Sequence, residues 1–354
     1  MANFCNLYFL RSLLASNFKR LAFPFKCSLA VTYRCNMRCR MCNIWKKETK
    51  EELSVAQIGD FFQKAPYFSW VGITGGEPFL RNDILDIIDI IVKYSKRLCA
   101  IHIATNGYLA DKIKSVIGET RKKYPKLKLV FTVSIDGPKN LHEDIRGVPG
   151  AWDRAVSTFC YLKQVPGAKV QFGFTISEHN MGRFKDTFEE LKKIYPKLRF
   201  DDVNVNIFQR SGFFYENPGM RGVNEADVIK DIDSILAMDK DAFSVNNFLR
   251  RAYLKLYERY VRLKKTPVKC QALSSSLYID SYGSLYPCMV FNKKLINIKE
   301  LETDFYYFWN SDMAKKASEE CAKNLCPLCW SPCDAFSSIL ASLPKTLRYA
   351  YQSA

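Results

Sequence analysis

Three cysteines, Cys35, Cys39 and Cys42, lie within eight residues in the stretch TYRCNMRCRMC and follow the spacing C-x3-C-x2-C. A structural zinc site needs four ligands and a disulfide needs two thiols. Three thiolates can bind three irons of a four-iron, four-sulfur cluster and leave the fourth iron without a protein ligand. An open metal position is typical of catalysis, so the spacing predicts a [4Fe-4S] cluster that binds a small molecule. Zinc is the alternative, although no neighbouring side chain completes its four ligands.

The elements that must position this loop alternate between strand and helix. Apolar, β-branched runs predict six strands, at 28–33, 70–74, 98–105, 128–136, 169–176 and 202–208. The intervening patterns predict helices at 54–64, 82–96, 110–124, 151–164, 181–194 and 224–238. Such alternation predicts an α/β fold with a parallel sheet, and six units suit a partial (β/α)6 barrel of the TIM type.

Every unusual polar motif falls where one of these strands ends. The cysteine loop follows the first strand, and the next four strands end in TGGEP (74–78), TNG (105–107), SIDG (134–137) and SEHN (177–180). In parallel α/β folds the chemistry takes place at the carboxyl ends of the strands. The motifs are therefore expected to converge on one site.

A second group of cysteines follows a change of pattern near residue 265. The stretch SLYIDSYGSLYPCMVF (276–291) predicts a hairpin that turns at 281–283. The group consists of Cys270, Cys288, Cys321, Cys326, Cys329 and Cys333. Grouping of this kind, in a long chain with 13 cysteines, favours metal binding in a reducing compartment over disulfides.

The three-cysteine loop after the first strand and GGEP (75–78) after the second resemble the radical S-adenosylmethionine (radical SAM) superfamily, over residues 28–210. The resemblance implies that S-adenosylmethionine chelates the open iron through its amino and carboxylate groups. It also implies that the reduced cluster cleaves this cofactor to methionine and a 5′-deoxyadenosyl radical, which abstracts hydrogen from a substrate. The protein is thus expected to be an enzyme.

The resemblance also implies which residues hold the cofactor. Gly75 and Gly76 let the backbone approach its methionine end closely, and Glu77 lies near its ammonium group. Ser134 and Arg146 look like the pair that holds its carboxylate, because a guanidinium can donate two hydrogen bonds to a carboxylate.

Further residues are expected around the same cofactor. Thr105 and Asn106 lie where contacts to the ribose are expected. Asp136 is the candidate catalytic residue, since it points toward the mouth of the barrel; the alternative is that it caps a turn. Met41 stands where the family often has an aromatic residue, and its thioether can still contact the adenine ring.

The second cysteine group resembles the auxiliary-cluster domain of the same superfamily, called SPASM in its full form and twitch in its short form. The full form carries seven cysteines and two clusters, whereas this chain has six candidates. One auxiliary [4Fe-4S] cluster is therefore expected, closed to substrate and suited to electron transfer, with zinc as the alternative. Its ligands are expected to be four of Cys270, Cys288, Cys326, Cys329 and Cys333, with Cys321 as the doubtful member.

These features divide the chain into five expected parts. They are an N-terminal amphipathic helix (1–27), the radical SAM core (28–240), a helical linker (241–265), the auxiliary domain (266–340) and a C-terminal tail (341–354). The expected fold class is accordingly an α/β partial barrel followed by a small cysteine-rich iron–sulfur domain.

The N-terminal segment is apolar with interleaved basic residues. Large apolar side chains recur at helical spacing, at Leu7, Leu10, Leu14, Phe18 and Leu21. The run between charges is too short to span a bilayer. The helix therefore either packs across its own domain or lies on the inner membrane surface through residues 1–22. The expected location of the protein is the cytoplasm.

The formal net charge of +17 favours anionic partners. The basic clusters lack the interleaved aromatics of a single-strand binder, so nucleic acid is the less expected partner. No N-terminal peptide-recognition extension is evident, which favours a small-molecule, sugar or lipid-linked substrate that is oxidised or rearranged. A peptide-maturing enzyme and an RNA-modifying enzyme are the alternatives. The expected electron donor is of the flavodoxin or ferredoxin type.

Overall fold

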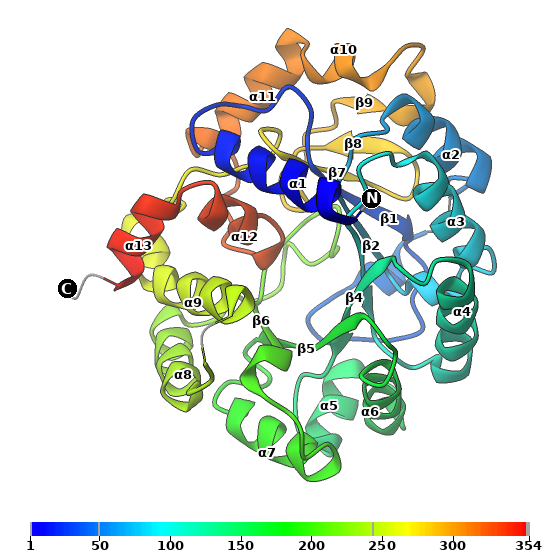
Figure 1. The fold of residues 1–354 in the computed structure, drawn as a ribbon. Helices are drawn as coiled ribbons and strands as arrows, with labels where there is room; N and C mark the ends of the chain where they lie inside the picture. Colours follow the sequence, from blue (N-terminus) through cyan, green and yellow to red (C-terminus); the bar gives the residue numbers. More distant parts are fainter. Residues whose placement is uncertain (1, 49, 243, 352–354) are drawn as a thin grey trace.

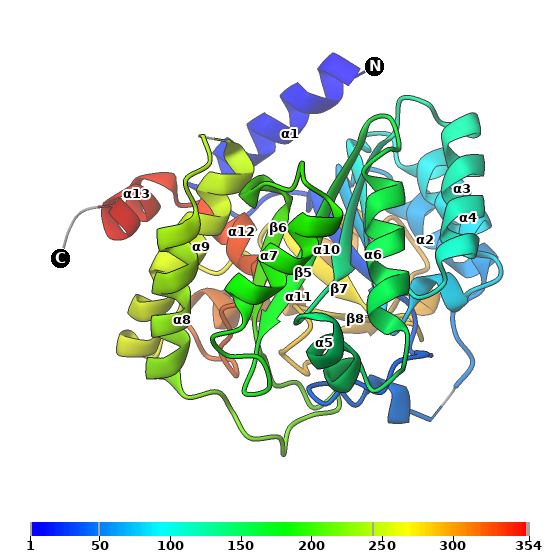
Figure 2. The same ribbon diagram turned by 90° about the horizontal axis from the view of Figure 1, so that it is seen from below.

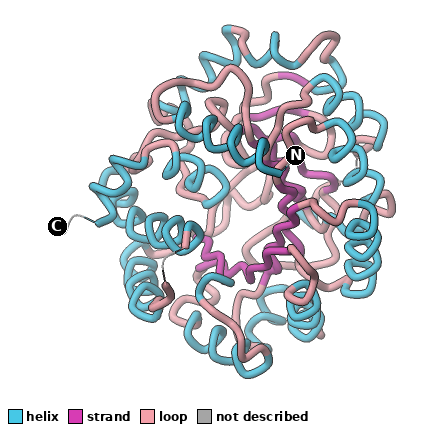
Figure 3. The backbone as a smooth tube through the Cα atoms, in the orientation of Figure 1, coloured by secondary structure: helices cyan, strands magenta, loops and turns pink. Residues whose placement is uncertain are grey.

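The computed structural model describes residues 2–48, 50–242 and 244–351, and its centre is a curved sheet that helices cover from outside (Figures 1 and 3). The six expected strands are confirmed. They are β1 (Lys26–Thr32), β2 (Trp70–Gly75), β3 (Ala100–Thr105), β4 (Lys128–Ser134), β5 (Ala168–Ile176) and β6 (Val203–Ile207). Each strand pairs in parallel with the next one along the chain. The fold is thus the expected partial α/β barrel.

Helices on the outside of the sheet connect these strands. They are α2 (Val55–Lys64), α3 (Ile84–Tyr94), α4 (Ala110–Lys123), α6 (Ala151–Leu162), α7 (Phe184–Ile194) and α8 (Glu225–Met238). Ser54 caps α2, because its hydroxyl accepts the amide of Gln57 and the Gln57 side chain accepts the amide of Ser54. The sequence pattern did not predict α5 (Lys139–Arg146), which ends at Gly147 in a left-handed conformation (φ 64°).

Strands of the C-terminal region extend the same sheet. β7 (Ser276–Ile279) pairs in parallel with β1, and β8 (Ser284–Tyr286) and β9 (Ile296–Asn297) follow in antiparallel register. The nine strands have the order β6-β5-β4-β3-β2-β1-β7-β8-β9. β7 and β8 form the hairpin expected at 276–291. Because β7 bonds to β1, the C-terminal region and the barrel share one hydrogen-bonded sheet.

Helices complete the C-terminal part of the chain. α9 (Val245–Leu263) fills most of the expected linker, and α10 (Phe305–Trp309), α11 (Asp312–Ala322), α12 (Pro332–Leu340) and α13 (Leu343–Tyr351) follow it. Short 3-10 helices lie at η1 (Ile44–Lys46), η2 (Pro78–Leu80), η3 (Phe200–Asp202) and η4 (Ile298–Glu300). Tyr253 of α9 and Trp330 exchange two hydrogen bonds, since each side chain donates to the other's backbone oxygen (3.0 and 2.9 Å). This exchange fixes α9 to the segment that carries the last cysteines.

The first helix, α1 (Ala2–Ser16), lies across the amino-terminal end of the barrel, opposite to the loop that follows β1 (Figure 2). It packs inward through Ser12 and Ser16, which are buried. The apolar stripe expected from the sequence faces solvent instead, apart from the buried Leu21. Its exposed members are Leu7, Leu10, Leu14 and Phe18. Among the described helices, none is both long enough and apolar enough to cross a membrane.

The described cysteines outside the two groups include one that is disulfide-bonded. Cys27 and Cys160 are free thiols. Cys99, just before β3, is disulfide-bonded, whereas the preference for metal binding concerned the grouped cysteines, all of which are free thiols. The spacing of cysteines along the chain could not reveal it, because a disulfide depends on how close two Cα atoms come in the fold.

Candidate functional site

The three-cysteine loop (35–42) leaves β1 at its carboxyl end, and neighbouring elements hold its backbone. The amide of Arg38 donates to the carbonyl oxygen of Arg146 at the end of α5 (2.9 Å). Just beyond the loop, the amide of Asn43 donates to the carbonyl oxygen of Tyr215, in the segment after β6 (2.8 Å). Two elements that are distant in sequence therefore fix the shape of the loop.

The three thiols of this loop are close enough to affect one another's ionisation. Burial raises the pKa of Cys35 to about 11 and that of Cys42 to about 12, and the neighbouring thiols add to both shifts. Burial also raises the pKa of Cys39, although the guanidinium of Arg146 opposes this shift and donates to its Sγ (3.6 Å). Such thiols stay protonated unless a metal holds them as thiolates. The donor set therefore fits the irons of a cluster.

Three buried donors beside the loop have no hydrogen-bond partner among the described residues. They are Nδ2 of Asn36, Nε1 of Trp45 and Nε of Arg146. A buried N–H group without a partner is costly in free energy. Unpaired donors suit a site that receives an anionic group, such as the sulfides of a cluster or the carboxylate of S-adenosylmethionine. The residues present thus fit both expected cofactors.

Gly75 and Gly76 bring the end of β2 against the end of β1 and the residues just before the cysteine loop. A Cβ atom at Gly75 would lie 2.0 Å from the carbonyl oxygen of Thr32, and one at Gly76 would lie 2.1 Å from that of Arg34. Gly75 also has a φ of +127°, which side chains disfavour. The close packing of two backbone segments therefore requires both glycines. Their expected contact with the cofactor stays a prediction.

Glu77 connects the end of β2 to the end of β3. Its buried carboxylate accepts hydrogen bonds from Oγ1 of Thr105 (2.8 Å) and from the amides of Asn106 (2.7 Å) and Phe79 (3.2 Å). The side chain of Asn106 extends the network, because its Nδ2 donates to Oδ1 of Asn36 in the cysteine loop (2.8 Å). The structure thus brings Glu77, Thr105 and Asn106 together. Their expected contacts with ammonium and ribose stay predictions.

Glu77 gives the protein a pH-dependent stability. Burial raises the pKa of its carboxyl group from 4.5 to about 7, despite the hydrogen bonds that the carboxylate accepts. Between pH 4.5 and about 7, Glu77 holds a proton in the folded state that it releases in the unfolded state. This difference stabilises the folded state fully below pH 4.5, and the stabilisation is lost as the pH rises through the folded-state pKa of about 7. We expect the free energy of unfolding to fall by about 3 kcal/mol across this window.

The variant Glu77→Gln isolates this contribution. Urea unfolding of both proteins at a series of pH values should give a flatter profile for the variant, since the amide does not titrate. Parallel profiles for the two proteins would show that Glu77 is not the group responsible.

Asp136 and Arg146 form a buried ion pair beside the cysteine loop. Nη2 of Arg146 donates to Oδ2 of Asp136, and their side chains are 11% and 0% exposed. Burial opposes the charge on Arg146, but Asp136 and Cys39 outweigh burial and raise the pKa of the guanidinium. Oδ1 of Asp136 also accepts the amide of Thr175 (2.8 Å). The structure therefore gives Asp136 a positioning role and no exposed surface toward a substrate. Ser134, the expected partner of Arg146, is half-buried at the end of β4.

The motif after β5 reaches the same site. A small cavity is lined by Arg40 and Met41 of the cysteine loop and by Ser177, Glu178 and His179 after β5. Residues of the loop after β6 close it from a third side. The strand-end motifs therefore converge as the parallel sheet predicts.

Five cysteines of the C-terminal region gather in a second group. Cys321 shares a hydrogen bond with Cys326, and Cys329 shares one with Cys288. Burial raises the pKa of Cys270, and the nearby Cys288 and Cys326 add to the shift. In contrast, the hydrogen bond from Cys321 lowers the pKa of Cys326 to about 6. The group contains enough thiols for the four ligands of one auxiliary cluster.

Cys321 is the member of this group that sequence reasoning left in doubt. It lies near the end of α11, and the chain returns to the group five residues later at Cys326. The signal available in the sequence was a cysteine among the polar residues of a helix, which indicates a buried side chain. The spacing of the CxxC pairs does not include this residue.

Cys333 lies between the first cysteine group and the five, since the thiol of Cys288 also adds to the pKa shift that burial gives Cys333. It packs in an apolar cluster that also contains Cys35, Cys42 and Tyr215. Burial raises the pKa of Tyr215, and the thiols of Cys333, Cys42 and Cys329 add to the shift. Tyr215 therefore lies between the two cysteine groups.

The loop after β6 (208–217), which carries this tyrosine, bonds to both groups. Nδ2 of Asn217 donates to the carbonyl oxygen of Met41, next to Cys42 (3.0 Å). Oγ of Ser211 donates to the carbonyl oxygen of Met289, next to Cys288 (2.8 Å). This connection was not evident from the sequence, because the loop has no motif of its own.

Comparisons with known proteins cover both cysteine groups. Residues 29–191 match the Radical SAM superfamily, and residues 270–334 match the iron–sulfur cluster-binding domain SPASM. The antilisterial bacteriocin subtilosin biosynthesis protein AlbA of Bacillus subtilis is 24% identical over 319 residues, which are 86% of this chain and 65% of AlbA. An AdoMet-dependent heme synthase of Oleidesulfovibrio alaskensis is 30% identical over 168 residues, which are 45% of this chain and 40% of the synthase. The chain thus spans less than two thirds of either relative.

A solved structure shows the same fold. Streptococcus suis SuiB bound to S-adenosylmethionine aligns with a TM-score of 0.56 and 15% identity, over 87% of this chain and 68% of SuiB. The barrel and the cysteine-rich region each have a family match, and both expected metal sites lie inside the matched residues. The chain therefore belongs to the radical SAM superfamily, as an enzyme with a [4Fe-4S] cluster, S-adenosylmethionine and a C-terminal SPASM domain for auxiliary iron–sulfur binding.

Proposed function

We propose that the enzyme removes a hydrogen atom from an anionic substrate that enters at the carboxyl ends of the strands. When bound, the cluster and S-adenosylmethionine supply the 5′-deoxyadenosyl radical for this step. Cys35, Cys39 and Cys42 would hold the cluster. The unpaired donors of Asn36 and Arg146 remain available to anionic groups of the cofactor. The protein thereby orients the reactants and excludes water.

Unpaired cations on the rim of the barrel carry the proposal of an anionic substrate. Arg38 and Lys46 belong to the segment after β1, Arg210 and Arg221 belong to the segment after β6, and all four are exposed. Within the described part of the chain, no ion pair involves any of the four. Cations around a cleft raise the local concentration of anions. Phosphate or carboxylate groups are therefore the expected recognition elements of the substrate.

A small molecule, or the phosphate-bearing headgroup of a lipid-linked molecule, is the first candidate within this class. A peptide is the second candidate, and the match to AlbA favours it. AlbA is named as a bacteriocin biosynthesis protein and aligns over 86% of this chain, whereas the heme synthase aligns over 45%. The longer alignment extends beyond the barrel and supports a shared use of both cysteine groups.

The remaining partners are proposed on charge. A flavodoxin or ferredoxin is commonly acidic and would complement the net charge of +17. Transfer RNA is also anionic, and salt-sensitive binding of it would indicate the RNA-modifying alternative. The cytoplasmic location and the presence of one auxiliary cluster stay predictions.

The test is anaerobic turnover of the reconstituted enzyme with a reductant, S-adenosylmethionine and fractionated cell extract, read as 5′-deoxyadenosine. We expect fractions retained on an anion exchanger to stimulate turnover. The double variant Arg210→Glu/Arg221→Glu should weaken this stimulation at low salt. The double variant Lys126→Glu/Lys128→Glu makes the same charge change at exposed positions before and at the start of β4, and it serves as the control.

Treatment of the active fraction separates the candidates. Loss of stimulation after protease identifies a peptide, loss after nuclease identifies RNA, and resistance to both identifies a small molecule or lipid-linked substrate. Stimulation by unretained fractions alone, or equal effects of the two double variants, would reject an anionic substrate.

A further inference from the structure

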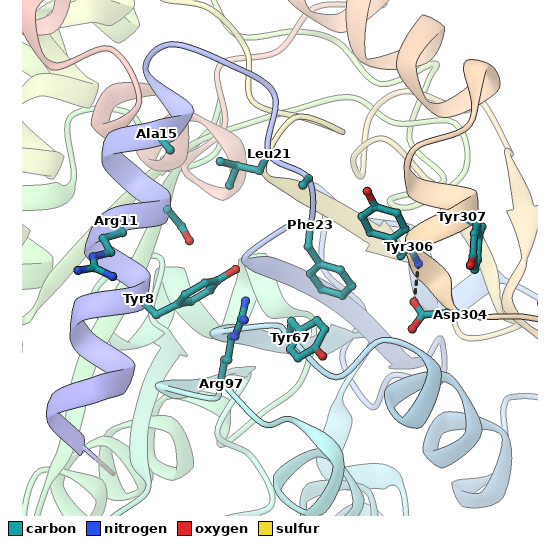
Figure 4. A pocket seen from close by; sticks show the side chains of 12 residues that line it. Tyr8, Arg11, Ala15, Leu21, Phe23, Tyr67, Arg97, Asp304, Tyr306 and Tyr307 are labelled. Carbon is teal, nitrogen blue, oxygen red and sulfur yellow. Dashed lines mark hydrogen bonds between the residues drawn. The ribbon is translucent and has the colours of Figure 1, made fainter.

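A cavity of about 570 Å³ opens at the amino-terminal end of the barrel. It lies between α1 and α10, and the segments before β1, β2 and β3 contribute Phe23, Tyr67 and Arg97 to its lining (Figure 4). None of the residues assigned above to the cofactors lines it. The cavity is therefore separate from the cofactor site, and any ligand that it binds is a different molecule.

The lining of this cavity is cationic and aromatic. The guanidinium of Arg97 lies 3.7 Å from the ring centroid of Tyr8 and 4.4 Å from that of Tyr67. Arg11 of α1 provides a second cation. Asp304 is the one carboxylate among the described lining residues, and it serves as the N-cap of α10. With Arg11 and Arg97 against one described carboxylate, the lining has a net positive formal charge, which suits a phosphate group.

The two helices that border the cavity, α1 and α10, carry exposed apolar or aromatic side chains. On α1, Leu10 and Leu14 are each 52% exposed, and Phe18, two residues beyond the end of the helix, is 89% exposed. On α10, Tyr306 and Tyr307 are 49% and 69% exposed, and both line the cavity. Exposed leucines on one helix face, with a phenylalanine just beyond the helix and with tyrosines and cations nearby, are typical of surfaces that lie in a lipid interface.

We propose that this face docks on an anionic phospholipid bilayer, with a lipid phosphate in the cavity between α1 and α10. The exposed side chains of α1 then enter the boundary between headgroups and acyl chains, to a depth of about 5–10 Å. Arg11 and Arg97 provide the charge that complements the phosphate. The helix lies on the bilayer and does not cross it.

The net charge of the chain selects a lipid surface over a second copy. Two copies, each with a formal net charge of +17, repel each other, whereas an anionic bilayer attracts the chain. The docking surface and the cysteine loop lie at opposite ends of the barrel (Figure 2). The proposal therefore does not depend on the substrate proposed above.

Vesicle sedimentation of the full, iron-loaded enzyme tests the proposal. We expect binding to vesicles that contain phosphatidylglycerol and much weaker binding to vesicles of phosphatidylcholine alone. The double variant Leu10→Glu/Leu14→Glu should lose binding, and Arg11→Ala should bind about fivefold more weakly. Ile194→Glu introduces one such charge on α7, at a position that is 51% exposed, and this control should bind like the wild type.

Iron content and circular dichroism establish that each variant is folded, and Arg11→Ala tests the cavity even where the leucine variant is unstable. Absence of binding to phosphatidylglycerol at low salt overturns the proposal, and so does binding that neither α1 variant weakens. Light scattering tests whether a second copy of the chain occupies this face instead. A dimer that Leu10→Glu/Leu14→Glu dissociates would assign the face to a second copy and refute the proposal of lipid binding.

Discussion

Replacing Arg146 with methionine should lower the free energy of unfolding by about 3–5 kcal/mol, because the carboxylate of Asp136 then remains buried without a counter-charge. The Asp136 side chain is 0% exposed, so water cannot replace the guanidinium. The same change removes the donor to Sγ of Cys39, so iron content should fall as well. Urea unfolding at neutral pH and iron analysis after reconstitution measure the two effects.

Two further variants make this prediction specific. Arg40→Met breaks an ion pair with Asp144 whose side chains are 51% and 48% exposed, and it should cost about 1 kcal/mol or less. The double variant Asp136→Asn/Arg146→Met should recover part of the lost stability, because a neutral amide is cheaper to bury than a lone carboxylate. Equal costs for Arg146→Met and Arg40→Met would contradict a buried ion pair.

Replacing Cys329 with alanine should remove the auxiliary cluster, so that iron content falls from about eight to about four atoms per chain. Cys329 belongs to the five gathered thiols and shares a hydrogen bond with Cys288. Cys333→Ala should keep the full iron content, since the other five thiols are enough for the four ligands and Cys333 packs against the apolar cluster beside Cys35 and Cys42. Iron and acid-labile sulfide, counted after anaerobic reconstitution, separate these outcomes.

The free cysteine Cys160 supplies the matched control, because it lies outside both groups. Cys160→Ala should leave iron content unchanged. If Cys333→Ala loses iron while Cys329→Ala does not, the assignment of the five thiols is wrong and Cys333 is a ligand.

The barrel could be predicted from the sequence because its elements are local and regular. Each strand is a short apolar run and each following helix is amphipathic, so the six strands were found to within a few residues. α5 was missed, because its eight residues, Lys139–Arg146, are mostly polar and end at a glycine. The pairing of β7 with β1 was also missed, since it joins segments about 250 residues apart and no local pattern encodes it.

The cofactor site was predictable in its residues but not in its contacts. The cysteine spacing and the strand-end motifs indicated where to look. The motifs did not show that Gly75 and Gly76 pack against the backbone just before the cysteine loop, or that Asp136 forms an ion pair with Arg146. These relations depend on side-chain packing between strands, which a linear pattern does not contain. The same reason explains why the sequence left Cys321 in doubt.

The placement of α1 opposite the cysteine loop sets a working distance for an enzyme that rests on a bilayer. β2, with six residues, spans about 20 Å from one end of the barrel to the other. A reacting carbon near the acyl chains would stay far below the mouth, out of reach. A lipid-linked substrate must therefore carry its reacting carbon on a long polar headgroup, while a soluble metabolite or peptide meets the mouth from the aqueous side. In this arrangement the membrane selects where the enzyme works, and the length of the barrel selects which molecules it can reach there.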